Sequence, residues 1–282
     1  MKYALVRYTL LLLVLLCVGA QADSNADTGG VPKRIIALAP HITEMLFAIG
    51  AGDKVVAVSD YSDYPEQAQN LPSVASYASI NLEAVLALKP DLVIAWRSGN
   101  PAAELARLEA LGIRIAYSDP LTLDDIATEL TLLGELSGQA VQAKTVAQAF
   151  SQQLAELRAQ YQHKRPLPVF FAMGTAPLST VANNAWPQQM LTLCGAQNVF
   201  SQVKGDYPQV GIEQLLLAAP ELIIQPVKQV DMADWRYWQR FSALPAVKKQ
   251  QFLAIEADLI YRTTPRTISG IRQLCQGIDK YR

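Results

Sequence analysis

The chain is poor in the residues and motifs that most enzymes need. Among its 282 residues are two histidines and three cysteines, the net charge is −1, and no block of basic residues occurs. Absent motifs include the G-x-S-x-G elbow, a G-x-G-x-x-G loop after a strand, the P-loop and H-E-x-x-H. We therefore predict no catalytic site, no resident cofactor, no metal site and no nucleic-acid partner. The alternative, from a different functional class, is that the chain is an exported α/β enzyme.

The two histidines lie too far apart in the sequence to predict a shared metal site. His163 falls at the polar end of a predicted helix. His41 follows Pro40 directly after the first predicted strand, and ligands of open α/β sheets bind at the carboxyl ends of strands. His41 is thus a candidate ligand to a bound metal complex, although an ordinary residue at a helix start is the favoured interpretation.

Long apolar runs are missing after the N-terminal segment. Lys2 and Arg7 there accompany a short apolar run, Leu10 to Val18, and Ala20-Gln21-Ala22 has the small-x-small pattern of a cleavage site. The run is too short to span a bilayer. We therefore predict that residues 1–22 are a cleaved signal peptide, which directs the chain through the inner membrane.

Cysteine usage is consistent with export. Leu16 precedes Cys17 where a lipoprotein signal would carry a small residue, which favours cleavage over a lipid anchor. Cleavage leaves Cys194 and Cys275, and an even pair in an exported protein is typical of a disulfide. Such a bridge would close a loop of about 80 residues and stabilise by about 4 kcal/mol. Two unpaired buried thiols are the alternative.

One phrase occurs twice in the chain. Residues 81–94 read NLEAVLALKPDLVI, and residues 211–224 read GIEQLLLAAPELII. The copies share an apolar residue, a glutamate, two apolar residues, a proline, an acid and an apolar triplet. Two copies at a fixed offset predict two similar lobes, with a ligand in the cleft between them.

Short β-branched runs alternate with helical stretches along both halves of the chain. Predicted helices cover residues 43–49, 101–111 and 269–281, and predicted strands cover residues 34–38, 55–58, 92–95, 113–117, 168–172, 222–224 and 251–255. Strands separated by helices of this length indicate βαβ units and parallel sheets.

A single long helix is predicted between the repeated phrases, because residues 139–165 contain neither glycine nor proline. Apolar residues recur there at helical spacing: Val146, Phe150, Leu154, Leu157 and Tyr161. About 25 residues would form a rod of roughly 38 Å. We expect a rigid connector with little lobe closure, the alternative being a long helix packed on one domain. The predicted domains are a first lobe (32–138), a connecting helix (139–165) and a second lobe (166–282).

Aromatic residues gather just after predicted strands and in loops. They are Tyr61, Tyr64, Tyr77 and Trp96, followed by Arg97, in the first lobe, and Trp186, Tyr207 and Tyr261, followed by Arg262, in the second. Aromatic faces bury a large area at little cost in conformational entropy, which suits a large, flat and mostly neutral ligand. Packing within the lobe is the alternative for each of them.

The glutamates of the repeated phrase, Glu83 and Glu213, follow the helix N-cap candidates Asn81 and Gly211. An acid in the first turn complements the helix dipole by about 0.3–1 kcal/mol, which alone would explain either glutamate. Their equivalence predicts more. One carboxylate on each lobe, in pseudo-two-fold symmetry, suits docking onto a symmetric dimer that carries arginines.

An extended set of segments resembles the periplasmic binding proteins for cobalamin and ferric siderophores, and most of all the cobalamin-binding members that serve ABC importers. The segments are Arg34 to Pro40, Thr43-Glu44, Tyr61 to Pro65, Asn81 to Glu83, Lys89 to Arg97, Cys194-Gly195, Tyr207 to Val210 and Pro265-Arg266. The resemblance covers essentially the whole chain after the signal peptide.

This resemblance implies an α/β fold in which two Rossmann-like lobes are joined by a single long rigid helix. It implies that cobalamin is a transported ligand and that the protein works in the periplasm without catalysis. The implied partner is the dimeric permease of an ABC transporter in the inner membrane, and we expect the binding protein to be a monomer.

The resemblance also implies roles for single residues. Ligand-binding positions are Tyr61, Tyr77, Trp96, Arg97, Tyr207, Asp258, Leu259, Ile260, Tyr261 and Arg262; docking glutamates are Glu83 and Glu213; the disulfide joins Cys194 and Cys275. Close relatives carry an aromatic pair and an acid after Asp258, where this chain has Leu259-Ile260-Tyr261, so we expect a thinner aromatic wall. Haem or a ferric siderophore in the same architecture is the alternative, for which Arg97, Arg262 and His41 are the pointers.

Overall fold

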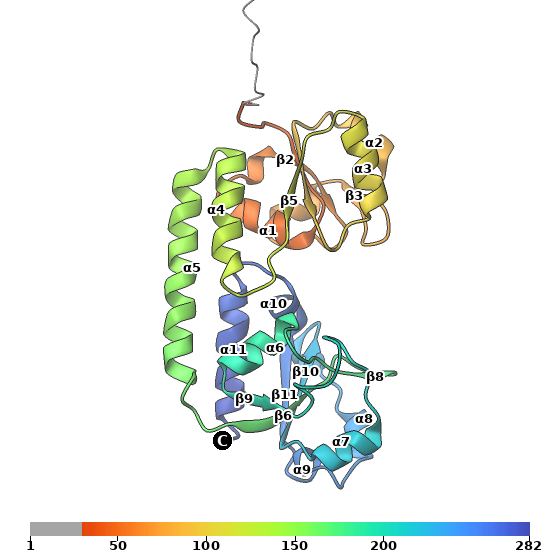
Figure 1. Cartoon of the computed structure of the whole chain (residues 1–282), viewed down its shortest axis with the longest axis vertical. Coiled ribbons are helices and arrows are strands. Elements are labelled where there is room, and N and C mark those ends of the chain that lie inside the picture. Colours follow the sequence, from red (N-terminus) through yellow and green to blue (C-terminus); the bar gives the residue numbers. More distant parts are fainter. Residues whose placement is uncertain (1–29) are drawn as a thin grey trace, which may run out of the picture. The chain divides into compact units, whose positions relative to one another are not determined.

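The computed structural model describes residues 30–282, and two parallel β-sheets organise them into two lobes (Figure 1). Both lobes belong to one unit, Val31–Arg282. The predicted signal peptide, with Leu16 and Cys17, lies outside the described residues. Within the described residues, every helix is too short or too polar to cross a membrane.

The first lobe is built on a five-stranded sheet in the order β3-β2-β1-β4-β5. Its strands are β1 (Ile35–Ala37), β2 (Val55–Ser59), β3 (Ser73–Ala75), β4 (Leu92–Trp96) and β5 (Ile115–Ser118). The chain adds β2 and β3 on one side of β1 and then β4 and β5 on the other. The strand order therefore reverses between β1 and β4, which is the switch point where ligands of open α/β sheets bind.

Helices cover both faces of this sheet. They are α1 (Pro40–Ala48) and α4 (Asp125–Ser137) on one face and α2 (Leu82–Ala87) and α3 (Ala102–Ala110) on the other, with the short turns η1 (Gly52–Lys54) and η2 (Glu66–Asn70). Along β1, Ile35 and Ala37 join one core and Ile36 and Leu38 the other, as the two-residue period of a strand requires. Helix α1 begins at Pro40, earlier than predicted, because proline suits the first helical turn.

The second lobe contains a four-stranded sheet in the order β11-β10-β6-β9, which reverses between β6 and β10. Its strands are β6 (Leu167–Phe171), β9 (Ala196–Asn198), β10 (Leu222–Val227) and β11 (Phe252–Glu256), beside a small hairpin of β7 (Gly174–Thr175) and β8 (Leu178–Ser179). Its helical segments are α6 (Trp186–Leu193), α7 (Ile212–Ala218), η3 (Val230–Met232), α8 (Arg236–Gln239), α9 (Pro245–Lys248), α10 (Ala257–Tyr261) and α11 (Thr267–Asp279).

The predicted long helix is α5 (Ala140–Tyr161), and it lies against both α4 and α11 (Figure 1). Helix α4 was not predicted from the sequence. Gly138, at a φ of +73°, makes the turn between α4 and α5, and the two helices approach so closely that a Cβ on Gly134 would lie 2.2 Å from the Ala143 Cβ.

The predicted apolar stripe of α5 is buried, with Val146 only partly so. It belongs to one hydrophobic cluster that contains residues of both sheets. A shared core couples the lobes through packed side chains. The predicted fold class, two lobes joined by one long helix, is confirmed.

The two copies of the repeated phrase have the same structure, a short helix followed by a central strand: α2 with β4, and α7 with β10. The Asn81 side-chain oxygen accepts a hydrogen bond from the Ala84 backbone N–H at 3.0 Å. Gly211 has no side chain to cap with, and its backbone N–H instead donates to the Gln214 side chain at 2.9 Å.

The predicted disulfide is present between Cys194, which follows α6, and Cys275 in α11. Both cysteines are fully buried, and 81 positions of sequence separate them. The bridge joins two helices that pack against the same face of the second sheet.

Candidate ligand-binding site

Exposed aromatic residues lie along the carboxyl edge of the first sheet. Tyr77 follows β3, Tyr61 follows β2 and Trp96 ends β4. Their residue exposures are 85%, 78% and 39%. Since the carboxyl ends of parallel strands meet at one edge, three positions that are distant in sequence present aromatic surface on the same side of the lobe.

Trp96 is held in one orientation. Its indole N–H donates to Asp119 Oδ1 at 3.0 Å, and Asp119 also accepts a hydrogen bond from the Ser98 hydroxyl at 2.6 Å. The ring lies so close to Gly99 that a Cβ there would sit 1.9 Å from a ring carbon. A glycine and a carboxylate therefore preorganise this aromatic surface before any ligand arrives.

His41 lies in the buried first turn of α1 and packs edge-on against Trp96, with 5.5 Å between the ring centroids. Its Nε2 is 3.4 Å from the Ser118 hydroxyl. Burial lowers the pKa of His41 to about 4, against the opposing influence of Asp119, so the imidazole is neutral at pH 7. The residue supports the tryptophan from inside the lobe.

Tyr61 has a φ of 63°, in the left-handed region that bulky residues rarely adopt. A buried chain of hydroxyl groups fixes the turn around it. Thr43 Oγ1 donates to Ser62 Oγ at 3.1 Å, and the Ser59 and Ser62 hydroxyls lie 3.3 Å apart. A pocket of about 480 Å³ opens at this turn, lined by residues that include Tyr61 and Asp63.

Arg97 lies beside Trp96 in sequence but in a different environment. Its guanidinium stacks over the Tyr117 ring at 4.2 Å, and the Tyr117 hydroxyl donates to Glu109 at 3.0 Å. Tyr117 packs against the core beneath α2 and α3. The charged group of Arg97 is thus placed on the side of the lobe that carries these helices.

In the second lobe, Tyr207 and Tyr261 are brought together by the fold. They are 56% and 39% exposed, in the loop after β9 and at the end of α10. Burial raises the pKa of the Tyr261 hydroxyl, and the neighbouring Tyr207 raises it further. The two phenol rings thus lie near each other at the carboxyl edge of the second sheet, and the Tyr261 hydroxyl is neutral.

Two predicted ligand positions have buried side chains. Leu259 is 6% exposed and Ile260 is fully buried within the second lobe. Leu259 also lies against Gly270, where a Cβ would meet its carbonyl oxygen at 2.4 Å. If these two residues contact the ligand as predicted, the contact must therefore involve their backbone atoms rather than their side chains.

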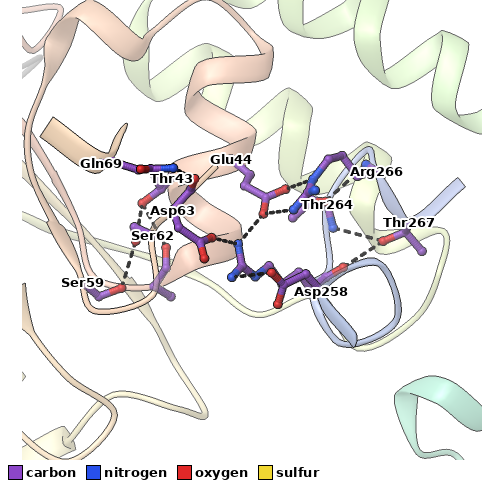
Figure 2. Close-up of polar contacts among 12 residues, drawn as sticks. Thr43, Glu44, Ser59, Ser62, Asp63, Gln69, Asp258, Thr264, Arg266 and Thr267 are labelled. Atoms are coloured by element: carbon purple, nitrogen blue, oxygen red, sulfur yellow. Dashed lines mark hydrogen bonds and ion pairs between the residues drawn. The ribbon is translucent and has the colours of Figure 1, made fainter. Parts of the chain in front are cut away.

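Arg262 is engaged by carboxylates of both lobes. Its Nη1 contacts Glu44 Oε1 at 2.9 Å and Asp63 Oδ1 at 2.7 Å, while its Nη2 lies 3.0 Å from Asp258 Oδ2. Figure 2 shows this cluster, in which Arg266 also binds Glu44. Burial alone would lower the pKa of Arg262, but its hydrogen bonds to Asp63 and Glu44 outweigh burial and raise it.

Sequence reasoning missed Glu44 and Arg266 as members of this cluster. Thr43-Glu44 and Pro265-Arg266 were among the segments that carry the family resemblance, but 222 positions separate the two residues. No local pattern pairs residues at that distance. A second cavity, of about 730 Å³, lies beside the cluster and is lined by other residues than the predicted ligand positions.

The docking candidates Glu83 and Glu213 are both exposed in the first turns of α2 and α7. Among residues 30–282, we find no group of three or more His, Cys, Asp or Glu side chains that could hold a metal ion. The chemistry offered at the two carboxyl edges is aromatic surface with phenol hydroxyl groups.

Comparison with known proteins decides the family. The periplasmic binding protein family matches residues 35–259. The chain belongs to this family. A vitamin B12-binding protein of Vibrio cholerae serotype O1 is 43% identical over 244 residues, covering 86% of this chain and 88% of that protein. A vitamin B12-binding protein of Yersinia pestis is 40% identical over 268 residues, covering 94% and 90%.

Solved structures of periplasmic binding proteins share the fold. The crystal structure of the periplasmic vitamin B12 binding protein BtuF of Vibrio cholerae has a TM-score of 0.80 at 42% identity, covering 89% of this chain and 98% of that chain. The periplasmic heme-binding protein RhuT from Roseiflexus sp. RS-1 has a TM-score of 0.79, covering 88% and 98%. At 22% identity, the second likeness shows the fold alone.

Proposed function

We propose that this periplasmic binding protein captures cobalamin in the periplasm and delivers it to an ABC transporter of the inner membrane. The observation that carries the proposal is the 43% identity, over most of both chains, to a relative named for vitamin B12 binding. In this proposal, lobes 32–138 and 166–282 hold the ligand between their carboxyl edges, and segment 139–165 connects them.

The candidate site suits a large neutral ligand. Trp96, Tyr61 and Tyr77 offer aromatic faces on one lobe, and Tyr207 and Tyr261 offer phenol rings on the other. Burial of such faces supplies most of the affinity, and the phenol groups give orientation through hydrogen bonds. Corrin carries amide side chains, which are matched by neutral hydrogen-bonding partners rather than by charges.

Haem or a ferric siderophore remains the second candidate, because haem-binding proteins share the fold. The three residues that pointed to such ligands are placed in ways that favour a neutral ligand instead. His41 is buried under Trp96, Arg262 is paired with three carboxylates, and Arg97 stacks on Tyr117. Anionic chelates bind best to arginines whose donors are not already satisfied.

Delivery to the transporter rests on Glu83 and Glu213. Both are exposed on equivalent helices of the two lobes, and a dimeric permease would offer each the same basic surface. The lobes differ one helical turn after these glutamates. The second lobe has Leu217 there, which is 88% exposed, and the first lobe has Ala87 at the equivalent position. In this proposal the binding protein acts as a monomer that spans both halves of the permease.

Isothermal titration of the purified protein with cyanocobalamin tests the proposal, with haem and a ferric hydroxamate siderophore as competing ligands. We expect one-to-one binding of cyanocobalamin and no comparable heat from the iron compounds. Binding of haem or the siderophore in place of cyanocobalamin would keep the transport role and overturn the ligand.

A further inference from the structure

Glu44 makes the most heavily engaged buried ion pair that the structure describes. Its carboxylate lies on α1 of the first lobe with 2% of the side chain exposed. It accepts hydrogen bonds from Arg266 Nε and Nη2, both at 2.8 Å, and from Arg262 Nη1 at 2.9 Å. Both arginines belong to the second lobe. A two-point contact of this kind fixes orientation as well as distance.

Groups around Glu44 extend the cluster on both sides. Asp63 of the first lobe binds Arg262 at 2.7 Å, and the Arg266 guanidinium lies 3.8 Å from the centre of the Tyr64 ring. Asp258 binds Arg262 from within the second lobe. Figure 2 shows Glu44 and Asp63 on one side and Asp258 and Arg266 on the other. Three carboxylates thus meet two guanidinium groups where the lobes touch.

Burial makes this cluster sensitive to the loss of one member. The side chains of Arg262 and Arg266 are only 10% and 22% exposed. Removing one partner of a buried pair leaves the other charge without compensation in a poorly hydrated site. The Arg158–Asp124 pair has the same two-point geometry, but its side chains are 42% and 65% exposed, so its loss is of little consequence.

The cluster borders a cavity, although the lobes also share an apolar core. The cavity of about 730 Å³ beside Glu44 is lined by Phe47 of α1, Gln153 of α5 and Ile268 of α11, among others. A second contact between the lobes is neutral: the Gln189 side chain exchanges hydrogen bonds with the backbone of Leu121 and Leu123. The ion cluster is therefore the charged part of a junction that also contains a shared apolar core and a neutral hydrogen-bonded contact.

The cluster also lies next to predicted ligand-binding residues on each lobe. Arg262 directly follows Tyr261, and Asp63 is two residues from Tyr61 in the turn that Thr43 and Ser62 fasten to α1. The Glu44 contacts are therefore adjacent to one predicted ligand-binding aromatic residue on each lobe.

We propose that Glu44 is a positioning residue: through Arg262 and Arg266 it fixes the separation of the lobes, and with it the spacing of Tyr61 and Tyr261 across the ligand. The proposal rests on the proposed function for its effect on affinity. Its effect on lobe separation does not depend on the ligand. It assigns a role to the Thr43-Glu44 and Pro265-Arg266 segments, for which none was predicted from the sequence.

The test compares Glu44→Gln with the parent and with Asp124→Asn, which disrupts the exposed Arg–carboxylate pair. Spin labels at Leu111→Cys and Lys248→Cys, two exposed positions on different lobes, report the distance between lobes by double electron–electron resonance. The chain from Asp23 onward is used, so that the native disulfide holds the remaining cysteines. Cyanocobalamin affinity is measured in parallel on the unlabelled proteins.

We expect Glu44→Gln to widen the distance distribution and to raise the Kd for cyanocobalamin by about tenfold or more. Asp124→Asn should match the parent in both. A parental distance distribution in folded Glu44→Gln would overturn the proposal, whatever the Kd. A wider distribution with an unchanged Kd would overturn the link to ligand spacing.

Two controls keep the outcomes apart. If Glu44→Gln does not fold, Arg266→Lys keeps the charge but loses the two-point contact, and it should widen the distribution by a smaller amount; a parental distribution would again overturn the proposal. If the parent fails to bind cyanocobalamin, the proposed function fails, while a wider distribution in Glu44→Gln still supports the role of Glu44 in lobe separation.

Discussion

The Trp96 indole N–H donates to the Asp119 carboxylate at 3.0 Å, although 23 positions separate the two residues. Trp96 ends β4, and Asp119 follows the neighbouring strand β5 at the same edge of the sheet. The hydrogen bond turns an exposed tryptophan into a fixed surface. We expect this hydrogen bond to aid ligand binding by preorganising the indole rather than by touching the ligand.

Asp119→Ala should therefore weaken cyanocobalamin binding by about 1 kcal/mol, the usual net value of one hydrogen bond, while the protein stays folded. Asp119→Asn keeps an acceptor oxygen and should bind nearly as well as the parent. Titration calorimetry on both variants measures the difference. Equal affinities for Asp119→Ala and the parent would show that the orientation of Trp96 does not matter to the ligand.

Trp96→Ala should cost about 1–3 kcal/mol of cyanocobalamin binding, which is the range for a buried aromatic anchor. The reason is the loss of aromatic area against the ligand. Trp235→Phe is the matched control, because Trp235 stacks on Phe252 in the second lobe, outside the candidate site. Titration of both variants measures the cost, and an unchanged dissociation constant for Trp96→Ala would remove this residue from the site.

Reversing the charge of both candidate docking glutamates, in Glu83→Arg with Glu213→Arg, should abolish complex formation with the transporter and leave cyanocobalamin binding intact. In the proposed complex, each substitution replaces an attraction to basic permease residues with a repulsion. Co-purification with the transporter in detergent provides the readout. The control reverses two exposed glutamates on other helices, Glu135→Arg with Glu156→Arg, and a complex formed equally by both double variants would rule out the docking role.

The buried His41 should make the stability of the protein depend on pH. Its pKa is about 4 in the folded protein, whereas an unfolded histidine has a pKa near 6.5, so between these values the unfolded state binds the extra proton. The free energy of unfolding should therefore fall as the pH decreases from about 6.5 towards 4. The contribution of His41 to this fall is on the order of 3 kcal/mol.

His41→Gln removes this contribution, and urea unfolding at pH 7, 5.5 and 4 measures it as the difference between parent and variant. Burial raises the pKa of Glu129, which has the opposite effect on stability as the pH falls. Because Glu129 is present in both proteins, its effect cancels in the difference. A difference that stays constant with pH would mean that His41 titrates normally in the folded state.

Removing the disulfide, in Cys194→Ala with Cys275→Ala, should lower the free energy of unfolding by about 4 kcal/mol, because the unfolded chain regains the freedom of a long loop. Denaturant unfolding measures this loss. Affinity for cyanocobalamin at low temperature should not change, since the bridge joins α6 and α11 away from the exposed aromatic residues. A loss below about 1 kcal/mol would indicate that the unfolded state is restrained by other means.

Local sequence patterns were sufficient for much of the fold. The strand of the first repeat copy, the helix that becomes α5 and its buried stripe from Phe150 to Tyr161 all follow from spacing and from the placement of glycine and proline. The disulfide and the membership of the periplasmic binding protein family were also predicted correctly. Helix α4 escaped prediction, because its burial against α5 involves a close contact at Gly134 that no single-segment pattern reveals.

The candidate site was predictable in part. Aromatic residues after strands are visible in the sequence, since strand ends follow from local patterns, and these residues remain predicted ligand contacts. Their surroundings were not visible. The support of Trp96 by Asp119 and His41 depends on which strands are neighbours, and strand order is a property of the whole sheet.

The sequence by itself determined the two-lobe α/β architecture and the positions of the exposed aromatic residues, because periodicity, repeats and strand ends can be read along the chain. It also determined the family, through the segments that resemble its other members. Only the tertiary structure decided how Glu44 meets Arg262 and Arg266, and that Leu259 and Ile260 turn inward while Tyr261 does not. Contacts between residues some 220 positions apart form only after the two lobes have folded and joined. The electrostatic attraction between these residues is strong only at separations of a few ångströms, in a site that folding has removed from water.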